Sequence, residues 1–331
     1  MSVGRSRPQL ALAPEPSSEQ APERIKVAYI GGLGRSGSTL LDRMLGQLPG
    51  FFSAGEIRDL WQRGLVENRL CGCGTAFREC PFWTQVGFEA FGGWDQIDVR
   101  EVLALSRAVD RHRKIPFLLA PSMWPPFRRR LAEFMAYLDP LYRAIHQVGG
   151  TRVIVDSSKA PSTAFVLRRM SSLDLRLVHL IRDSRGVAYS WNKRVIRPDT
   201  PGKTVYMHRY QPARIGLRWI TRNIQMEALG RLGTPEVRVR YESAVTAPVE
   251  EIERVVAMLG EDVNSEEFGF ISKGRVRLTV NHTVMGNPVR MHLGTLQLRL
   301  DDEWRSAMSS RQRTIVSFLT RPLLRRYGYR P

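Results

Sequence analysis

A glycine- and hydroxyl-rich segment near the start of the chain has the residue types of an anion-binding loop. The segment YIGGLGRSGSTLL joins a short apolar run to the beginning of a predicted helix. Backbone N–H groups in such a loop, together with the positive end of the helix, bind phosphate-like groups. Counted from Gly32, Gly37 and Thr39 fit a G-x-x-x-x-G-K-[ST] pattern. The lysine position, however, is Ser38, and the cation is Arg35 inside the loop. This difference favours a phosphate-bearing donor other than ATP.

Four further segments carry charged or hydroxyl groups at predicted strand ends or in glycine- and proline-shaped loops, namely residues 54–58, 156–161, 180–185 and 282–290. Open α/β sheets bind ligands outside the carboxyl ends of their strands, so we expect these segments to meet the loop at one site. Within them, Glu56 is a candidate general base. Lys159 and Arg182 are cations suited to a negatively charged ligand. His282 is interpreted as a residue that orders its loop.

The elements that must position these residues follow an alternating pattern of short apolar and longer amphipathic runs, which predicts parallel strands joined by helices. We expect strands at residues 27–31, 152–156, 175–181 and 237–241. The helices are expected at about residues 38–48, 162–170, 185–193, 249–259 and 302–319. The long stretch before the second of these strands has no strand-like run, so residues 57–150 are predicted to form a mostly helical lid.

These patterns predict an α/β protein with a P-loop-like, three-layer α/β/α fold, a central and mainly parallel sheet, and a mostly helical insertion after the first βα unit. Residues 25–331 are expected to form a single domain. Residues 1–24 are rich in Pro, Ser, Glu and Ala and lack an apolar core, which is typical of a disordered segment rather than a signal peptide. No apolar run approaches the roughly 20 residues that span a bilayer, so we expect no transmembrane segment and a cytoplasmic protein.

The net charge of +18 raises the question of a nucleic-acid partner. The arginines are spread along the chain, and no lysine run or repeated basic-aromatic module occurs. We therefore predict no nucleic-acid partner, and instead one anion-binding cleft for an acidic or phosphorylated ligand.

Three clustered cysteines, Cys71, Cys73 and Cys80, allow three interpretations. They bind zinc if a fourth ligand comes from elsewhere, or form one disulfide and one free thiol, or pack as reduced thiols. Because no second cysteine pair or neighbouring histidine accompanies them in the sequence, we predict a structural clip and no metal site.

On these motifs the chain resembles sulfotransferases that use 3′-phosphoadenosine 5′-phosphosulfate (PAPS), in particular the bacterial enzymes and the tyrosylprotein sulfotransferases. The family's R-S-G-[ST]-T loop binds the 5′-phosphosulfate, and its second motif pairs an arginine at a strand end with a later serine on the 3′-phosphate. The donor-binding residues that the resemblance implies are Arg35, Ser36, Gly37, Ser38, Thr39, Arg182, Ser190, Arg194, Tyr241, Asn287 and Arg290. Among these, Tyr241 is expected near the adenine, and Asn287 and Arg290 in a loop that closes over the nucleotide.

The resemblance also implies the reaction. The G-E-x-R motif provides Glu56 as the base that activates an acceptor hydroxyl or amine, while Lys159 and Arg35 stabilise the departing nucleotide without a metal. The acceptor alternatives are a small molecule, a glycan, a lipid or a peptide, and the oligomeric state is left open, a homodimer included. The competing interpretation is a P-loop small-molecule kinase or nucleotide hydrolase, for which Asp156 is the one strand-end acid that could serve magnesium.

Overall fold

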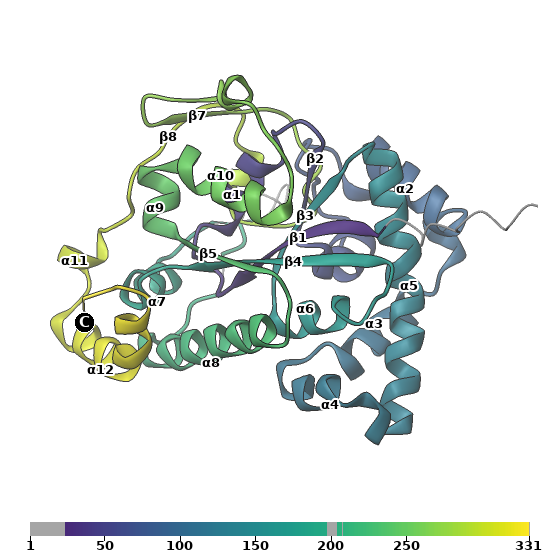
Figure 1. The fold of residues 1–331 in the computed structure, drawn as a ribbon, viewed down its shortest axis with the longest axis horizontal. Helices are drawn as coiled ribbons and strands as arrows, with labels where there is room; N and C mark the ends of the chain where they lie inside the picture. The colour runs from purple at the N-terminus through teal and green to yellow at the C-terminus, as the bar shows by residue number, and fades with distance from the viewer. Residues whose placement is uncertain (1–23, 197–203, 207, 331) are drawn as a thin grey trace, which may run out of the picture.

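A five-stranded parallel sheet forms the centre of the computed structural model, which describes residues 24–196, 204–206 and 208–330 (Figure 1). The predicted disordered segment 1–24 lies outside the described residues, apart from Arg24. The strands are β1 (Ile25–Gly32), β2 (Phe51–Gly55), β3 (Val153–Lys159), β4 (Leu173–Ile181) and β5 (Glu236–Arg240). They lie in the order β2-β3-β1-β4-β5, and every neighbouring pair is parallel.

Helices cover both faces of this sheet (Figure 1). Their bounds are α1 (Ser38–Leu45), α2 (Pro81–Phe91), α3 (Val99–Val109), α4 (Ile115–Leu119), α5 (Pro125–Gly149), α6 (Pro161–Leu167), α7 (Ser184–Asn192), α8 (Pro212–Arg231), α9 (Tyr241–Thr246), α10 (Pro248–Leu259), α11 (Trp304–Ala307) and α12 (Ser310–Arg326).

The central strand β1 shows why the sheet must be covered on both sides. Its side chains alternate between faces. Val27 and Tyr29 join one buried cluster with residues of α2, α3, α5, α6 and α8, whereas Ala28 and Ile30 join a second cluster with α1, α9 and α10. A strand that is apolar on both faces is typical of a parallel sheet enclosed by helices. The predicted three-layer α/β/α fold is confirmed.

The helical insertion is also confirmed, since α2, α3, α4 and α5 lie between β2 and β3. The prediction that the stretch before β3 contains no strand was wrong, because β2 lies within it. Strand β2 has the sequence FFSAG, lies at the edge of the sheet and contains no β-branched residue, so its pattern is weak. The predicted helix at 302–319 is instead two helices, α11 and α12, and α8 was not predicted.

A small antiparallel sheet, not predicted from the sequence, lies beside α1 and α10. It contains β6 (Ile271–Ser272), β7 (Arg275–Leu278) and β8 (Gly294–Gln297) in that order. Val276 and Leu278 of β7 join the core that contains α1 and α10. The connection from β7 to β8 therefore starts and ends close to the helix that follows the glycine-rich loop. Across the described part of the chain, no helix has the length and apolar character needed to cross a bilayer.

Candidate active site

The glycine-rich loop connects β1 to α1, as the sequence predicts, and the Tyr241 side chain packs closely against its backbone. Gly37 has φ +88°, and a Cβ atom at this position would lie 2.6 Å from Cδ2 of Tyr241. Ser38 and Thr39, in the first turn of α1, are buried. The Ser38 hydroxyl has no hydrogen-bond partner among the residues that the structure describes. The turn therefore offers an unused donor beside the positive end of a helix, which is the environment that an anion requires.

Arg35 projects from the same loop with an unusual backbone conformation, φ +73°. Its carbonyl oxygen accepts a hydrogen bond from Arg182 Nη1 at 3.0 Å, and its guanidinium lies 5.4 Å from the centre of the Trp191 ring. The indole Nε1 of Trp191 donates to the Gly34 carbonyl at 2.9 Å. Helix α7 and the end of β4 thus hold the loop and orient its cation.

Glu56 and Lys159 form an ion pair at the ends of the neighbouring strands β2 and β3. Lys159 Nζ lies 2.5 Å from Glu56 Oε1, and the two side chains are 17% and 18% exposed. Lys159 has φ +64° and also donates to the Ser157 carbonyl at 3.1 Å. A non-glycine residue in this region of φ costs on the order of 1–3 kcal/mol and persists where the surroundings require it. Here the conformation turns the ammonium back toward Glu56.

The loop and the ion pair border one pocket, whose lining residues are Gly34, Arg35, Glu56, Asp59, Arg63, Lys159, Trp191, Met285, Gly286 and Asn287. The structure therefore brings together Arg35, Glu56, Lys159 and Asn287, as the sequence analysis expected. It adds Asp59 and Arg63, which the sequence analysis missed. Both follow Glu56 closely in the chain, and that adjacency was the available signal. Burial, followed by the nearby Glu56 carboxylate, raises the pKa of Asp59.

Arg182 lies beside this pocket at the end of β4, and its guanidinium forms an ion pair with the carboxylate of Asp301. Arg182 Nη2 lies 2.9 Å from Asp301 Oδ2 and donates to the Asp301 carbonyl at 2.7 Å. Its guanidinium carbon lies 4.3 Å from the centre of the Tyr241 ring. Lys193 Nζ is 3.5 Å from Asp301 Oδ1. Arg182 and Lys193 thus both face the Asp301 carboxylate. Ser190, which lies on α7, is buried.

Of the other predicted donor residues, Asn287 lines the pocket, whereas Arg290 and Arg194 do not. The Asn287 backbone N–H donates to Thr39 Oγ1 at 3.0 Å, so this loop does close over α1. Arg290 is buried and donates to the Thr283 and Leu70 carbonyls at 3.1 and 2.7 Å, contacts that hold the loop rather than reach the pocket. Arg194 is exposed, and its guanidinium stacks 4.0 Å from the centre of the Tyr206 ring, outside the pocket lining.

Asp156, the acid that a magnesium-dependent kinase would need, is fully buried below the pocket. Its Oδ2 accepts a hydrogen bond from the Tyr142 hydroxyl at 2.6 Å, and its Oδ1 accepts from the Ser158 backbone N–H at 2.9 Å. Burial raises its pKa to about 6. Both oxygens are committed to internal partners, so this carboxylate is poorly placed to hold a metal ion at the loop.

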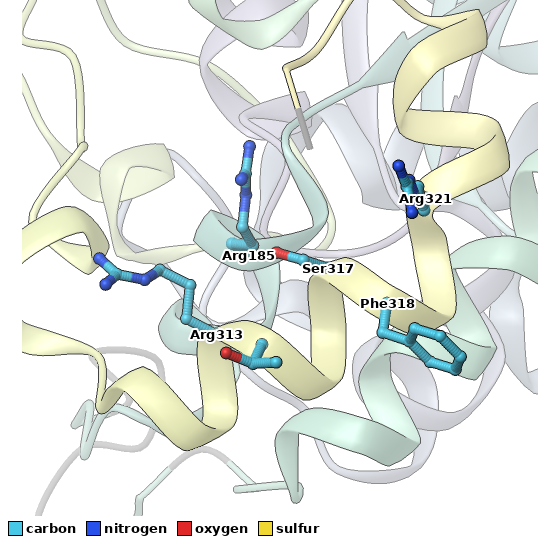
Figure 2. Close-up of a pocket in the computed structure, with 6 residues that line it drawn as sticks. Arg185, Arg313, Ser317, Phe318 and Arg321 are labelled. Atoms are coloured by element: carbon cyan, nitrogen blue, oxygen red, sulfur yellow. The ribbon is translucent and has the colours of Figure 1, made fainter.

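A second hollow, between Arg185 of α7 and helix α12, is lined by Arg185, Arg313, Thr314, Ser317, Phe318 and Arg321 (Figure 2). Arg185 already pairs with Asp183 at 2.7 Å, and Phe318 is 76% exposed. No residue of the glycine-rich loop borders this hollow. We therefore place the candidate chemistry at the pocket of Arg35, Glu56 and Lys159.

Comparisons with known proteins agree with this fold. No protein-family model and no curated protein matches the sequence. Among solved structures, the sulfotransferase domain of the Synechococcus PCC 7002 olefin synthase is 21% identical, with a TM-score of 0.52, and the match covers 95% of this chain and 98% of that one. The sulfotransferase domain of the curacin biosynthetic pathway is 15% identical (TM-score 0.46, 91% and 99% covered). Sulfotransferase STF9 from Mycobacterium avium is 11% identical (TM-score 0.47, 94% and 78% covered). The chain has the P-loop-like α/β fold of the sulfotransferases.

Proposed function

We propose that this protein transfers the sulfuryl group of PAPS to an acceptor hydroxyl or amine. One observation carries the proposal: a glycine-rich loop with an internal cation, Arg35, borders the same pocket as an acid–base pair, Glu56 and Lys159. The olefin synthase sulfotransferase domain, which matches almost the whole chain, supports it through the shared fold.

The donor's phosphosulfate would bind along the loop and the first turn of α1. Backbone N–H groups and the unpartnered Ser38 hydroxyl are suited to its oxygens. Arg35 supplies positive charge from within the loop, the position that the R-S-G-[ST]-T resemblance implies. Gly37 leaves room for Tyr241, whose ring lies directly against the loop and is our candidate for the adenine side of the donor.

The reaction is an in-line displacement at sulfur. The acceptor oxygen or nitrogen forms a bond to sulfur while the bond from sulfur to the bridging oxygen of the 5′-phosphate breaks. The acceptor proton moves to Glu56, and 3′-phosphoadenosine 5′-phosphate (PAP) leaves with the electron pair of the broken bond. Positioned proton transfer of this kind contributes about 10²–10⁴-fold in rate. Fixed cations at the bridging oxygen stabilise the charge that develops there.

The ion pair between Glu56 and Lys159 implies an exchange of partners when the donor binds. In the structure each charge compensates the other at 2.5 Å. A phosphosulfate beside Lys159 would take over the ammonium and leave the Glu56 carboxylate available for the acceptor proton. The pair therefore keeps a base and a cation in a partly buried pocket without an uncompensated charge.

Arg182 is proposed to recognise the 3′-phosphate, the group that separates PAPS from ATP. A guanidinium suits a terminal phosphate because its N–H groups form a planar fork. The Asp301 carboxylate pairs with this fork and also faces Lys193. We propose that the 3′-phosphate replaces the Asp301 carboxylate, and that Ser190 contributes its hydroxyl.

The transfer step is proposed to need no metal, because a sulfuryl group carries less charge than a phosphoryl group and Arg35 and Lys159 supply cations at the pocket. The commitment of Asp156 to Tyr142 and Ser158 also argues against a magnesium-dependent kinase. The acceptor is expected to be a small molecule, glycan, lipid or peptide that reaches Glu56.

Calorimetric titration with PAP and with ATP tests the proposal. We expect PAP to bind at least about tenfold more tightly than ATP, a difference of about 1.4 kcal/mol. ATP binding that equals or exceeds PAP binding, and that strengthens with added magnesium, would instead favour the kinase.

A further inference from the structure

The three clustered cysteines lie beside a histidine that comes from the far end of the chain. His282 stands in the loop between β7 and β8, and its ring lies against the cysteines of the insertion. Its Nδ1 is 3.2 Å from Cys80 Sγ and 3.9 Å from Cys71 Sγ. Cys73 Sγ is 3.7 Å from Cys80 Sγ, and all four ligand atoms lie within 4.8 Å of one another. From the sequence, His282 was interpreted as a residue that orders its loop, and its place beside the cysteines was not predicted because a single residue so far away has no spacing signal.

We propose that Cys71, Cys73, Cys80 and His282 form a structural zinc site. In a tetrahedral site with Zn–S of about 2.3 Å and Zn–N of about 2.0 Å, neighbouring sulfur atoms are about 3.7 Å apart and sulfur–nitrogen pairs about 3.5 Å. The Cys73–Cys80 sulfur separation of 3.7 Å matches the first value, and the His282 Nδ1 distances to Cys80 and Cys71, 3.2 and 3.9 Å, lie on either side of the second. Three thiolates and one imidazole also form a donor set that selects zinc over the oxygen-seeking magnesium and calcium. Four protein ligands leave no open position, which is the mark of a structural rather than a catalytic zinc ion.

The surroundings position the ligands for a metal. The Cys71 backbone N–H donates to the Thr75 carbonyl at 2.7 Å, and Cys80 is fixed at the start of α2. Phe82 stacks on the His282 ring with the ring centres 5.2 Å apart, which fixes the orientation of the imidazole. Such outer contacts orient metal ligands in known sites.

Two other interpretations fit the geometry less well. A disulfide requires sulfur atoms about 2.05 Å apart, whereas Cys73 Sγ and Cys80 Sγ are 3.7 Å apart and all three cysteines are free thiols. A nucleophilic Cys80 activated by His282 would need access for a substrate, but Cys80 is 0% exposed.

The zinc ion would join the insertion to the loop that lines the candidate active site. Gly72 N–H donates to the Thr283 carbonyl at 3.0 Å, and Trp83 Nε1 donates to the His282 carbonyl at 2.7 Å. A few residues on, Asn287 contacts Thr39 of α1. The site thus fixes the start of residues 282–290, whose later part borders the pocket. This inference stands whether or not the proposed reaction is correct.

The test is the metal content of the full chain, purified with zinc and a reductant present, then dialysed and measured by plasma mass spectrometry. We expect about one zinc ion per chain. His282→Gln is expected to lose it, whereas His292→Gln, a matched change in the same loop outside the cluster, keeps it. Removal of zinc by a chelator is expected to lower the melting temperature and increase amide exchange across residues 282–290.

A spectroscopic measurement protects the test against misfolded variants, since it needs only the wild-type chain. Replacement of zinc by cobalt is expected to give a thiolate-to-cobalt charge-transfer band and the intense visible bands of a tetrahedral ion. A wild-type chain that binds no zinc and gives no tetrahedral cobalt spectrum overturns the proposal. Mass-spectrometric detection of a disulfide among the cysteines in metal-free protein would then identify the alternative.

Discussion

Replacing Arg182 by glutamine should remove the preference of this protein for a 3′-phosphate. The guanidinium contacts the Arg35 carbonyl, Asp301 and the Tyr241 ring, and its side chain is only 6% exposed. Glutamine retains an N–H donor for the Arg35 carbonyl but loses the charge and the planar fork. Hydrogen bonds to charged groups contribute about 1.5–3 kcal/mol each. Part of this gain is offset because the phosphate must displace Asp301, so we take about 1.5–3 kcal/mol for the whole contact.

This free energy corresponds to a roughly 10- to 150-fold increase in the Kd for PAP. Calorimetric titration of wild type and Arg182→Gln with PAP and with AMP, which lacks the 3′-phosphate, separates recognition from loop support. We expect the Kd for AMP to change by about threefold or less. Arg254→Gln, a change of the same type at an exposed arginine of α10, controls for the lost charge. Equal losses for PAP and AMP would refute the reasoning, because Arg182 would then act only through the Arg35 carbonyl.

Two further predictions concern the loop and the buried acid beneath it. Gly37→Ala should abolish PAP binding because its Cβ would lie 2.6 Å from Tyr241, whereas Gly233→Ala, which has the same φ of +88° and nothing within 4 Å, should bind PAP normally. Backbone strain is expected to lower the free energy of unfolding of both variants by about 1 kcal/mol in urea. Retained PAP binding in Gly37→Ala would contradict the packing argument. Burial raises the pKa of Asp42 to about 7, above its unfolded value of about 3.9. The unfolded chain therefore loses this proton at a lower pH than the folded chain, and the free energy of unfolding falls as pH rises from about 4 to 7. Asp42→Asn removes this dependence, so its stability relative to wild type should be higher at pH 8 than at pH 5 by about 2.6 kcal/mol. A pH-independent difference in urea unfolding would show that Asp42 ionises normally.

The sequence predicted the parts of this fold that rest on local patterns. Strands β1, β3 and β4 each contain a short run rich in apolar residues because helices cover both faces of the sheet, and such runs can be recognised without a structure. The glycine-rich loop was found for a similar reason, since an anion site at a helix start needs glycines and hydroxyls in a fixed order. Strand β2 was missed because its FFSAG sequence lacks the β-branched residues that mark a strand.

The parts that could not be predicted depend on contacts between distant segments. Asp301 reaches Arg182 from the connection before α11, and nothing in the residues around it indicates this pairing. His282 of the β7–β8 connection meets Cys80 of the insertion although the two are 202 residues apart in the chain. Arg290 was expected at the nucleotide because of its motif, yet its guanidinium is buried on the Leu70 and Thr283 carbonyls. A motif gives a residue's neighbourhood, whereas the direction of its side chain is set by tertiary packing.

The most direct test of the central claim is to incubate wild type and Glu56→Gln with PAPS and with phenolic, alcoholic or amine acceptors, without added magnesium. The conversion of PAPS to PAP is then measured by chromatography. We predict PAP formation with an equal amount of sulfated acceptor, a rate lower by about 10²–10⁴-fold in Glu56→Gln, and a calorimetric affinity of that variant for PAP no weaker than that of wild type. PAP formation at the same rate in Glu56→Gln would remove this residue from the proton transfer. No PAP formation by wild type with any acceptor, together with magnesium-dependent consumption of ATP, would contradict the assignment of this pocket to sulfuryl transfer.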